Sequence, residues 1–330
     1  MKYYMAPMEG VTTQVYRRVY HKYFDDIDCY FTPFLASKKL SGKEKREIDP
    51  EINKGMKLVP QILSNQVDTF LAIAKQLEDL GYETVNLNLG CPSGTVVSRK
   101  RGSGQLQDLI ALDRFLDELF TKCPMKISIK TRIGMYFLSE WEEILEVYKK
   151  YPLEELIVHP RLQKEMYGGK VHLDEFGLAY GQIAPLCFNG DVFTEEAQQE
   201  VLDRFPQVDA IMLGRGLFRR PGLAGELRVN TIAGNHLTKS REIPPFEEMD
   251  ISEVASRERS TKKLLAFMEE LLEEYRTLYG PGQDTNVLFK MKDVWNFMAP
   301  TYADREKELK SIRKSQNIPE YRAAVRSIFS

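Results

Sequence analysis

Eight short segments rich in β-branched and aromatic residues recur along the chain, and each is followed by apolar residues at helical spacing. The predicted strands are Tyr3–Met8, Cys29–Leu35, Lys57–Leu63, Thr84–Leu89, Lys126–Arg132, Glu155–His159, Pro185–Asn189 and Asp209–Leu213. Between the third and fourth strands, the apolar residues Phe70, Ile73, Ala74, Leu77 and Leu80 have helical spacing. Eight strands that alternate with helices predict an α/β fold, a closed parallel (β/α)8 TIM barrel.

The length of 330 residues leaves room for a second domain, because such a barrel takes roughly 250 residues. The proline- and acid-rich segment Ile243–Glu248 predicts a linker. The spacing of apolar residues from Leu264 to Tyr279 predicts a helix that ends at Gly280. Further helices are expected over Val287–Met298, Arg305–Lys314 and Pro319–Phe329. We therefore expect a barrel over residues 1–240 and a smaller all-helical C-terminal domain over 241–330.

The composition is typical of soluble globular proteins, with 43% hydrophobic and 28% charged residues. The chain has no apolar run long enough to span a membrane, and its first residues lead into a strand without the layout of a signal peptide. We expect a cytoplasmic monomer with no membrane partner.

The four cysteines, Cys29, Cys91, Cys123 and Cys187, are scattered without a C-x-x-C pair or neighbouring histidines. This spacing predicts no metal site. Three of them lie in apolar strand or helix-end surroundings, where a small buried hydrophobic role is expected.

Charge is unevenly distributed along the chain. Residues 286–330 hold nine Lys or Arg against five acids, a local net charge of +4, which leaves −6 for the rest of a chain whose formal net charge is −2. A basic segment attached to an acidic body indicates binding to a polyanion, and a solvated helical surface is the alternative.

Polar residues and glycines gather at the carboxyl ends of the predicted strands, where barrel enzymes place their active sites. In chain order these ends are Ala6-Pro7-Met8-Glu9-Gly10, Gln61, Asn86–Pro92, Lys130-Thr131-Arg132, His159-Pro160-Arg161, Asn189-Gly190-Asp191 and Gly214-Arg215-Gly216. A single polar strand end is more often structural, but seven together predict an active site.

The last two strand ends predict a phosphate site, because the loops after strands seven and eight of such barrels often bind phosphate. Glycines at 190, 214 and 216 let backbone amides approach an anion, and Arg215 adds a charged fork. No G-x-G-x-x-G follows the first strand, so a mononucleotide cofactor is favoured over a dinucleotide.

This set of strand ends resembles the tRNA-dihydrouridine synthase family. The matching pieces are Ala6-Pro7-Met8 with Gly10 and Thr12, Gln61, Asn88-x-Gly90-Cys91-Pro92, Gly102-x-Gly104, Lys130-x-Arg132, His159-x-Arg161, Asn189-Gly190-Asp191 and Gly214-Arg215. Two departures stand out. Pro33 follows Thr32 where the family commonly has Glu, and the segment Val96–Gln105 is more basic and lacks the usual alanines.

The resemblance implies an FMN enzyme that uses NADPH to reduce a uridine of tRNA to 5,6-dihydrouridine. It implies that Pro7, Met8, Glu9 and Gln61 lie at the flavin ring, and that Lys130 and His159 reach the ring or the ribityl oxygens. It also implies that Asn189, Gly190, Asp191, Gly214 and Arg215 hold the phosphate, and that Asn88 and Arg161 hold the target base.

Cys91 is the candidate catalytic residue. The C5=C6 bond of uracil is conjugated to the C4 carbonyl, so hydride from the flavin adds at C6 and a proton is then needed at C5. A thiol with a pKa of about 8.5 is mostly protonated at neutral pH and can supply it. The alternative is an inert buried cysteine beside a turn.

The target base must leave its stack to reach a barrel mouth, so the rest of the RNA needs a surface. Arg99, Lys100 and Arg101 beside the Cys91 loop, and Lys290 and Lys292 in the tail, are the candidate phosphate contacts. A solvated helix face is the alternative for the two lysines, and Trp295 is expected in the core.

Two other functions remain open. One is a flavin barrel that reduces a free pyrimidine or another small enone, in the manner of dihydroorotate dehydrogenases. The other is an RNA-binding scaffold without catalysis, which is disfavoured because Cys91, Lys130 and the phosphate loops are all present.

Overall fold

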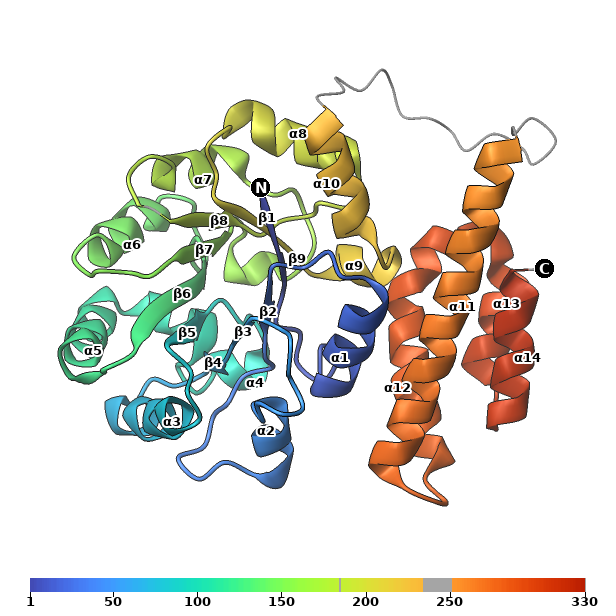
Figure 1. The fold of residues 1–330 in the computed structure, drawn as a ribbon. Coiled ribbons are helices and arrows are strands. Elements are labelled where there is room, and N and C mark those ends of the chain that lie inside the picture. Colours follow the sequence, from blue (N-terminus) through green and yellow to red (C-terminus); the bar gives the residue numbers. More distant parts are fainter. Residues whose placement is uncertain (184, 234–250, 330) are drawn as a thin grey trace. The chain divides into compact units, whose positions relative to one another are not determined.

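The structure, a computed structural model, describes residues 1–183, 185–233 and 251–329. Its strands form one parallel sheet in the order β3-β2-β1-β9-β8-β7-β6-β5-β4 (Figure 1). Their bounds are β1 Lys2–Met5, β2 Cys29–Phe31, β3 Leu58–Val59, β4 Gln61–Ile62, β5 Thr84–Leu89, β6 Lys126–Arg132, β7 Leu156–His159, β8 Leu186–Phe188 and β9 Ala210–Leu213. This order confirms the predicted (β/α)8 barrel.

The predicted third strand, Lys57–Leu63, is divided at Pro60, so the expectation of eight unbroken strands was wrong here. Proline has no backbone N–H and interrupts a ladder. On one side of it β3 pairs with β2, and on the other β4 pairs with β5. The backbone N–H of Gln61 instead donates to the side-chain oxygen of Thr32 at 3.0 Å. The two half-strands thus join the first and last parts of the sheet and bring the ring close to closure.

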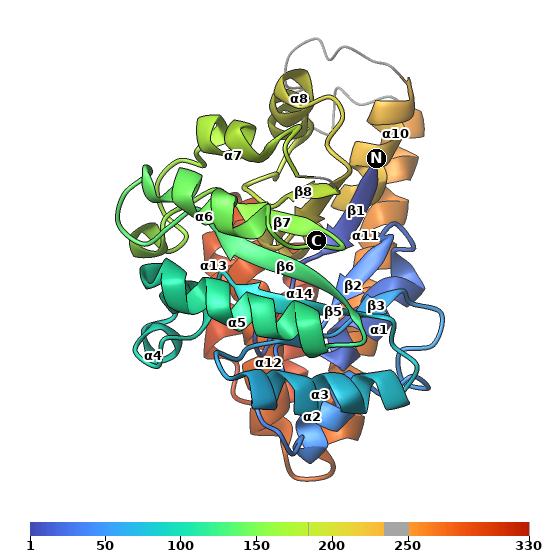
Figure 2. The same cartoon turned by 90° about the vertical axis from the view of Figure 1, so that its left-hand side faces the viewer.

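Helices α3 (Val67–Asp79), α5 (Leu109–Lys122), α6 (Glu140–Tyr148) and α7 (Leu173–Ala179) lie outside the ring of strands, as Figures 1 and 2 show. Helix α3 buries Phe70, Ile73, Ala74 and Leu77, as their spacing predicts, whereas Leu80 follows the last helical residue and is 43% exposed. Shorter elements follow individual strands: α2 (Gly42–Glu47), α4 (Gly94–Val97) and the 3-10 turns η1 (Gly102–Gln107) and η2 (Gln163–Glu165).

The described residues form two compact units. The first comprises 1–14, 27–192 and 197–214 and holds all the strands, and the second comprises 15–26, 193–196 and the described part of 215–330. The second unit therefore includes most of α1 (Gln14–Tyr23) as well as α9 (Arg215–Arg219) and α10 (Leu223–Ala233). The predicted linker Ile243–Glu248 lies outside the described residues. The division into a catalytic region 1–240 and an RNA-binding region 241–330 stays a prediction.

The C-terminal region is helical, as predicted. It contains α11 (Ile251–Tyr279), α12 (Asp284–Met298), the 3-10 segment η4 (Ala299–Arg305), α13 (Glu306–Lys314) and α14 (Ile318–Ile328). Trp295 is buried and donates from Nε1 to the Tyr321 hydroxyl at 2.9 Å, which confirms its expected core role. None of the described helices combines the length and the hydropathy that crossing a membrane requires.

An aromatic cluster joins α1 to α11 within the second unit. The ring of Phe267 meets Phe24 edge-on at 5.3 Å and Tyr20 at 6.3 Å. At the surface of the same contact, the Lys22 ammonium lies 2.7 Å from the Glu270 carboxylate. Helix α1 is thus packed with the C-terminal helices, although its position in the sequence places it directly after the first strand.

Candidate active site

A chain of buried polar side chains crosses three neighbouring strands, β4, β5 and β6, and reaches Asn88 near the carboxyl end of β5. The Gln61 amide donates to Asn86 Oδ1 at 2.8 Å and accepts from Asn88 Nδ2 at 2.7 Å. Asn86 in turn donates to the Ser128 hydroxyl at 2.9 Å. Because each buried amide is satisfied by the next one, the network fixes the orientation of Asn88.

Asn88 holds the loop that carries Cys91. Its Oδ1 accepts from the backbone N–H of Gly90 at 3.1 Å and from that of Cys91 at 2.9 Å. A short polar side chain that accepts from the following backbone stabilises a tight turn. The structure thus brings the candidate residues Gln61, Asn88 and Cys91 together, and it gives the Asn88 oxygen a positioning contact that the sequence did not reveal.

The 3-10 turn η1 supports the Cys91 loop from the other side. The carbonyl of Cys91 accepts from the Ser103 N–H at 3.1 Å and from its hydroxyl at 2.9 Å. Gly102 has φ +57°, and a side chain there would come within 2.8 Å of the Cys91 carbonyl oxygen. Glycine is therefore required at 102 both by its backbone conformation and by the close approach.

The Cys91 thiol is half-buried. Burial raises its pKa, and the nearby charges of Arg132 and Lys130 offset only part of that effect. Removing a thiolate from water is unfavourable, so the protonated form is stabilised. The thiol keeps its proton at neutral pH, as a proton donor must.

Lys130 extends from β6 beside this loop. Burial and, to a smaller extent, the neighbouring Arg132 guanidinium together lower the pKa of its ammonium to about 8. In the part of the chain that the structure describes, its ammonium forms no hydrogen bond or ion pair. A desolvated cation without an anionic partner is costly, so this position suits an electron-rich ligand atom.

Arg132, two residues further on the same strand, ties two loops together. It is buried and donates to the carbonyls of Gly90 at 3.0 Å and Leu162 at 2.9 Å. Burial lowers the pKa of its guanidinium to about 10. The sequence placed Arg132 at a strand end without a role. Its alternation with Lys130, two residues apart on one face of a strand, was the signal available.

Arg161 and Asp191 form an ion pair at 2.5 Å across the loops after β7 and β8. Arg161 is only 1% exposed, and it also donates to the carbonyls of Gly168 and Gly169 at 2.9 and 2.8 Å. Its third nitrogen lies 3.1 Å from His159 Nε2. The structure thus unites three predicted site residues, and it places the Asp191 carboxylate against a cation of the protein itself.

Close packing surrounds the two glycine loops expected to hold phosphate. A side chain at Gly190 would come within 2.5 Å of the Phe188 ring, so this position needs glycine. Asn189 donates to the Met212 carbonyl at 2.8 Å, which links the ends of β8 and β9. Gly214 directly follows β9, and a side chain there would make only ordinary van der Waals contact with Ala6 and Met8. Arg215, the next residue, has its guanidinium over the Phe193 ring at 5.6 Å.

The loop after β1 is a tight turn in which the Met8 carbonyl accepts from the backbone N–H groups of Val11 and Thr12, both at 3.0 Å. Pro7 and Met8 are half-buried. Glu9 is exposed and lies 3.7 Å from the Lys43 ammonium. Of this predicted group, Glu9 is therefore the residue at the solvent edge.

The predicted RNA contacts differ in how free their charges are. Arg99 and Lys100 are exposed and Arg101 half-buried, and within residues 1–183, 185–233 and 251–329 none of these three side chains has a hydrogen bond or ion pair. Lys292, by contrast, donates to the Ser315 carbonyl at 2.6 Å at the end of α13. Lys290 lies 5.8 Å from the centre of the Phe289 ring.

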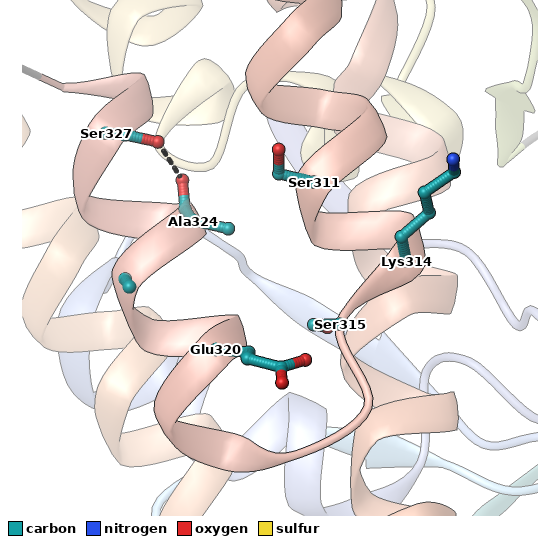
Figure 3. Close-up of a pocket in the computed structure, with 7 residues that line it drawn as sticks. Ser311, Lys314, Ser315, Glu320, Ala324 and Ser327 are labelled. Atoms are coloured by element: carbon teal, nitrogen blue, oxygen red, sulfur yellow. Dashed lines mark hydrogen bonds between the residues drawn. The ribbon is translucent and has the colours of Figure 1, made fainter.

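A small pocket between α13 and α14 shows no sign of ligand chemistry (Figure 3). Its serines donate to backbone carbonyls of their own helices, as Ser327 does to Ala324 at 2.8 Å and Ser315 to Ile312 at 2.8 Å. Glu320 accepts from the side chain of Asn317 at 2.8 Å, in the first turn of α14. These polar groups stabilise helix ends.

The fold and the strand ends define a (β/α)8-barrel protein with an enzyme-like site at the carboxyl ends of its strands. The chain matches the family model described as dihydrouridine synthase (Dus) over residues 4–296. It therefore belongs to the dihydrouridine synthase family, as the resemblance of its motifs indicated.

Two individual relatives share less than 30% sequence identity with the chain. The chain is 28% identical over 230 residues to the probable tRNA-dihydrouridine synthase of Staphylococcus epidermidis (strain ATCC 12228), covering 66% of this chain and 69% of that protein. It is 29% identical over 230 residues to the probable tRNA-dihydrouridine synthase 2 of Bacillus subtilis (strain 168), with the same coverage. Among solved structures, morphinone reductase is 12% identical with a TM-score of 0.48, covering 73% of this chain and 88% of that one.

Proposed function

We propose that this protein is a tRNA-dihydrouridine synthase that uses FMN and NADPH to reduce the C5=C6 bond of a tRNA uridine. The observation that carries the proposal is the Cys91 thiol, kept protonated by burial and held by Asn88 beside the Lys130 ammonium. A proton donor and a cation at one barrel mouth suit addition of hydride and a proton to an enone.

Several residues fit an FMN. The Lys130 ammonium suits the electron-rich N1–C2=O edge of the ring, and His159 lies on the neighbouring strand. Pro7, Met8 and Gln61 would contact the ring, with Glu9 at its solvent edge. Asn189, Gly190, Gly214 and Arg215 would hold the phosphate, and Asp191 would act by orienting Arg161. When bound, FMN supplies the hydride that adds to C6 of the uracil.

The residues of the chain manage the accompanying proton. Hydride addition at C6 places negative charge over C5 and O4, and Cys91 donates its Sγ proton to C5 as the C–H bond forms. The resulting thiolate regains a proton from solvent, and the Arg132 and Lys130 charges nearby stabilise it meanwhile. Asn88 keeps one N–H beyond the one it gives to Gln61, and Arg161 is the second candidate for binding the base.

A uridine within folded tRNA must be extruded to reach this site. Arg99, Lys100 and Arg101 are suited to the phosphates around it, because no partner in the described residues neutralises them. Lys290 is also proposed to contact RNA phosphates. Lys292 contributes less, because it binds the end of α13. A cytoplasmic location fits a tRNA substrate and stays a prediction.

The test asks whether the purified protein is yellow and which compound reoxidises its reduced flavin. The purified protein should be yellow and release FMN on denaturation, and NADPH should bleach it without oxygen. Unmodified tRNA transcripts should then restore the flavin absorbance faster than free uracil does. Faster reoxidation by uracil would favour the small-enone reductase, and a colourless protein that cannot be loaded with FMN would favour the RNA-binding scaffold.

A further inference from the structure

Two adjacent aromatic side chains stand exposed on the loop that follows β6. Phe137 is 67% exposed and Tyr136 is 49% exposed. This loop leaves the carboxyl end of the strand that carries Lys130 and Arg132. Exposed aromatic neighbours next to an active site indicate a binding surface more often than a single exposed apolar residue does.

The turn that presents these rings is held in one conformation. The Glu140 carboxylate accepts from the backbone N–H groups of Met135, Tyr136 and Phe137 at 2.6, 2.9 and 2.8 Å. Gly134 has φ +142°, and a side chain there would lie 2.8 Å from a Glu140 oxygen. These bonds order the backbone that carries two solvent-exposed rings. Ordering such a loop costs conformational entropy.

One cation and one amide contact this aromatic pair. The Lys164 ammonium lies over the Phe137 ring, 5.6 Å from its centre. The Tyr136 hydroxyl accepts from Gln107 at 3.3 Å, and Gln107 ends η1. That turn directly follows the basic run Arg99-Lys100-Arg101 and also contacts Cys91 through Ser103. The aromatic pair is thus linked through η1 to the basic run and to the Cys91 loop.

We propose that Tyr136 and Phe137 form a stacking platform for RNA bases next to the extruded uridine, an inference that rests on the proposed function. Extruding a base deprives its neighbours of a stacking partner. Aromatic side chains can replace that partner regardless of sequence, and nearby cations neutralise the flanking phosphates. The Lys164 ammonium and the basic run before η1 fit RNA better than a second copy of this chain, because like charges on two copies repel.

The test compares variants by their affinity for an unmodified tRNA transcript over a series of salt concentrations. Tyr136→Leu/Phe137→Leu keeps apolar area but removes both aromatic faces, and we expect about 5- to 100-fold weaker binding. The salt slope should stay unchanged, whereas Arg99→Gln and Lys100→Gln should each lower it by about one. Phe137→Trp should bind at least as well as the unaltered protein.

The matched control is Leu80→Ala, which shortens a 43% exposed apolar residue at the C-terminal end of α3. It should bind tRNA normally. Full affinity in the double Leu variant would overturn the proposal, and so would a dimer of the unaltered protein that the double substitution dissociates without changing RNA binding. Flavin content and reoxidation by tRNA in the unaltered protein are measured separately, because their failure would contradict the proposed function and not the stacking surface.

Discussion

The side-chain oxygen of Asn88 accepts a 2.9 Å hydrogen bond from the backbone N–H of Cys91. The nitrogen of the same amide donates to Gln61 at 2.7 Å. Asn88 therefore connects the buried amide network of the barrel to the loop that carries the thiol. This makes the position of Cys91 depend on a residue three places earlier.

Asn88→Ala should release the Cys91 loop. A freer thiol is better solvated, so its pKa should fall toward the ordinary value and its alkylation by iodoacetamide at pH 8 should speed up, about tenfold for each unit of pKa. Asn88→Asp keeps the acceptor oxygen and should leave alkylation slow. Mass spectrometry of the Cys91 peptide measures the rate without RNA, and equal rates in all three proteins would remove the positioning role.

Cys91→Ala should separate the proton step from the rest of the reaction. The variant should keep FMN, be reduced by NADPH and bind tRNA, because the thiol is proposed to contact neither the cofactor phosphate nor the RNA backbone. Reoxidation by tRNA should slow by about 10²–10⁴-fold, the contribution of a positioned general acid. Stopped-flow absorbance of the flavin follows this step. An unchanged rate would rule out the acid role, and loss of FMN would make Cys91 structural.

The strand ends were predictable because their signals are local. Cys91 follows the amides of β5 by a few residues, and its neighbours Gly90 and Pro92 mark a turn. The glycines at 190 and 102 were also among the residues singled out from the sequence. The structure shows that each is required by a close approach. The break at Pro60 could have been predicted too, because proline in a strand interior demotes it.

Contacts between distant loops could not be predicted in this way. Arg161 was assigned to a base and Asp191 to a phosphate, yet they pair with each other across 30 residues. The residue types allowed either outcome, and only the adjacency of β7 and β8 selects it. The same holds for α1, whose Tyr20 packs on Phe267 of α11 together with Phe24, the residue after the helix. Deleting the tail would expose that cluster, so charge substitutions test RNA binding more cleanly.

Lys130 predicts a pH dependence. Because burial lowers the pKa of its ammonium to about 8, the positive charge is present below that pH and is lost above it. If the charge stabilises electron density on the reduced flavin, the rate of flavin reduction by NADPH should be full at pH 7 and fall as the pH rises through 8. Lys130→Met should be slower and flat in this range. Cys91→Ala should keep this inflection near pH 8. If the inflection disappears in that variant, the titrating group is the thiol.

Arg215→Ala should weaken FMN retention if Arg215 holds the cofactor phosphate. Equilibrium dialysis of the protein against FMN measures the affinity, and riboflavin is the control ligand because it lacks the phosphate. The variant should lose affinity for FMN and bind riboflavin as the unaltered protein does. Equal FMN affinity in the two proteins would remove Arg215 from the phosphate site.

Glu155 predicts a pH-dependent stability at the amino-terminal end of β7. Burial raises the pKa of its carboxyl group to about 7 from an ordinary 4.5, and it accepts from the Tyr4 hydroxyl at 2.9 Å. The native state therefore holds this proton more tightly than the unfolded state. Burying this carboxyl group costs the least stability below pH 4.5, where it is protonated in both states. The free energy of unfolding then falls as the pH rises from 4.5 through 7.

Glu155→Gln resembles the protonated form at every pH and keeps an acceptor for Tyr4. The variant should be more stable than the unaltered protein at pH 8, by on the order of 1–3 kcal/mol, and this gain should shrink at pH 5.5. Urea denaturation at the two pH values gives the difference and cancels the titration of all other groups. Glu154→Gln is the matched control, since its exposed carboxylate lies 3.6 Å from Lys126 at the surface. A gain from Glu155→Gln that is the same at both pH values would show that the carboxyl group is not the source of the pH dependence.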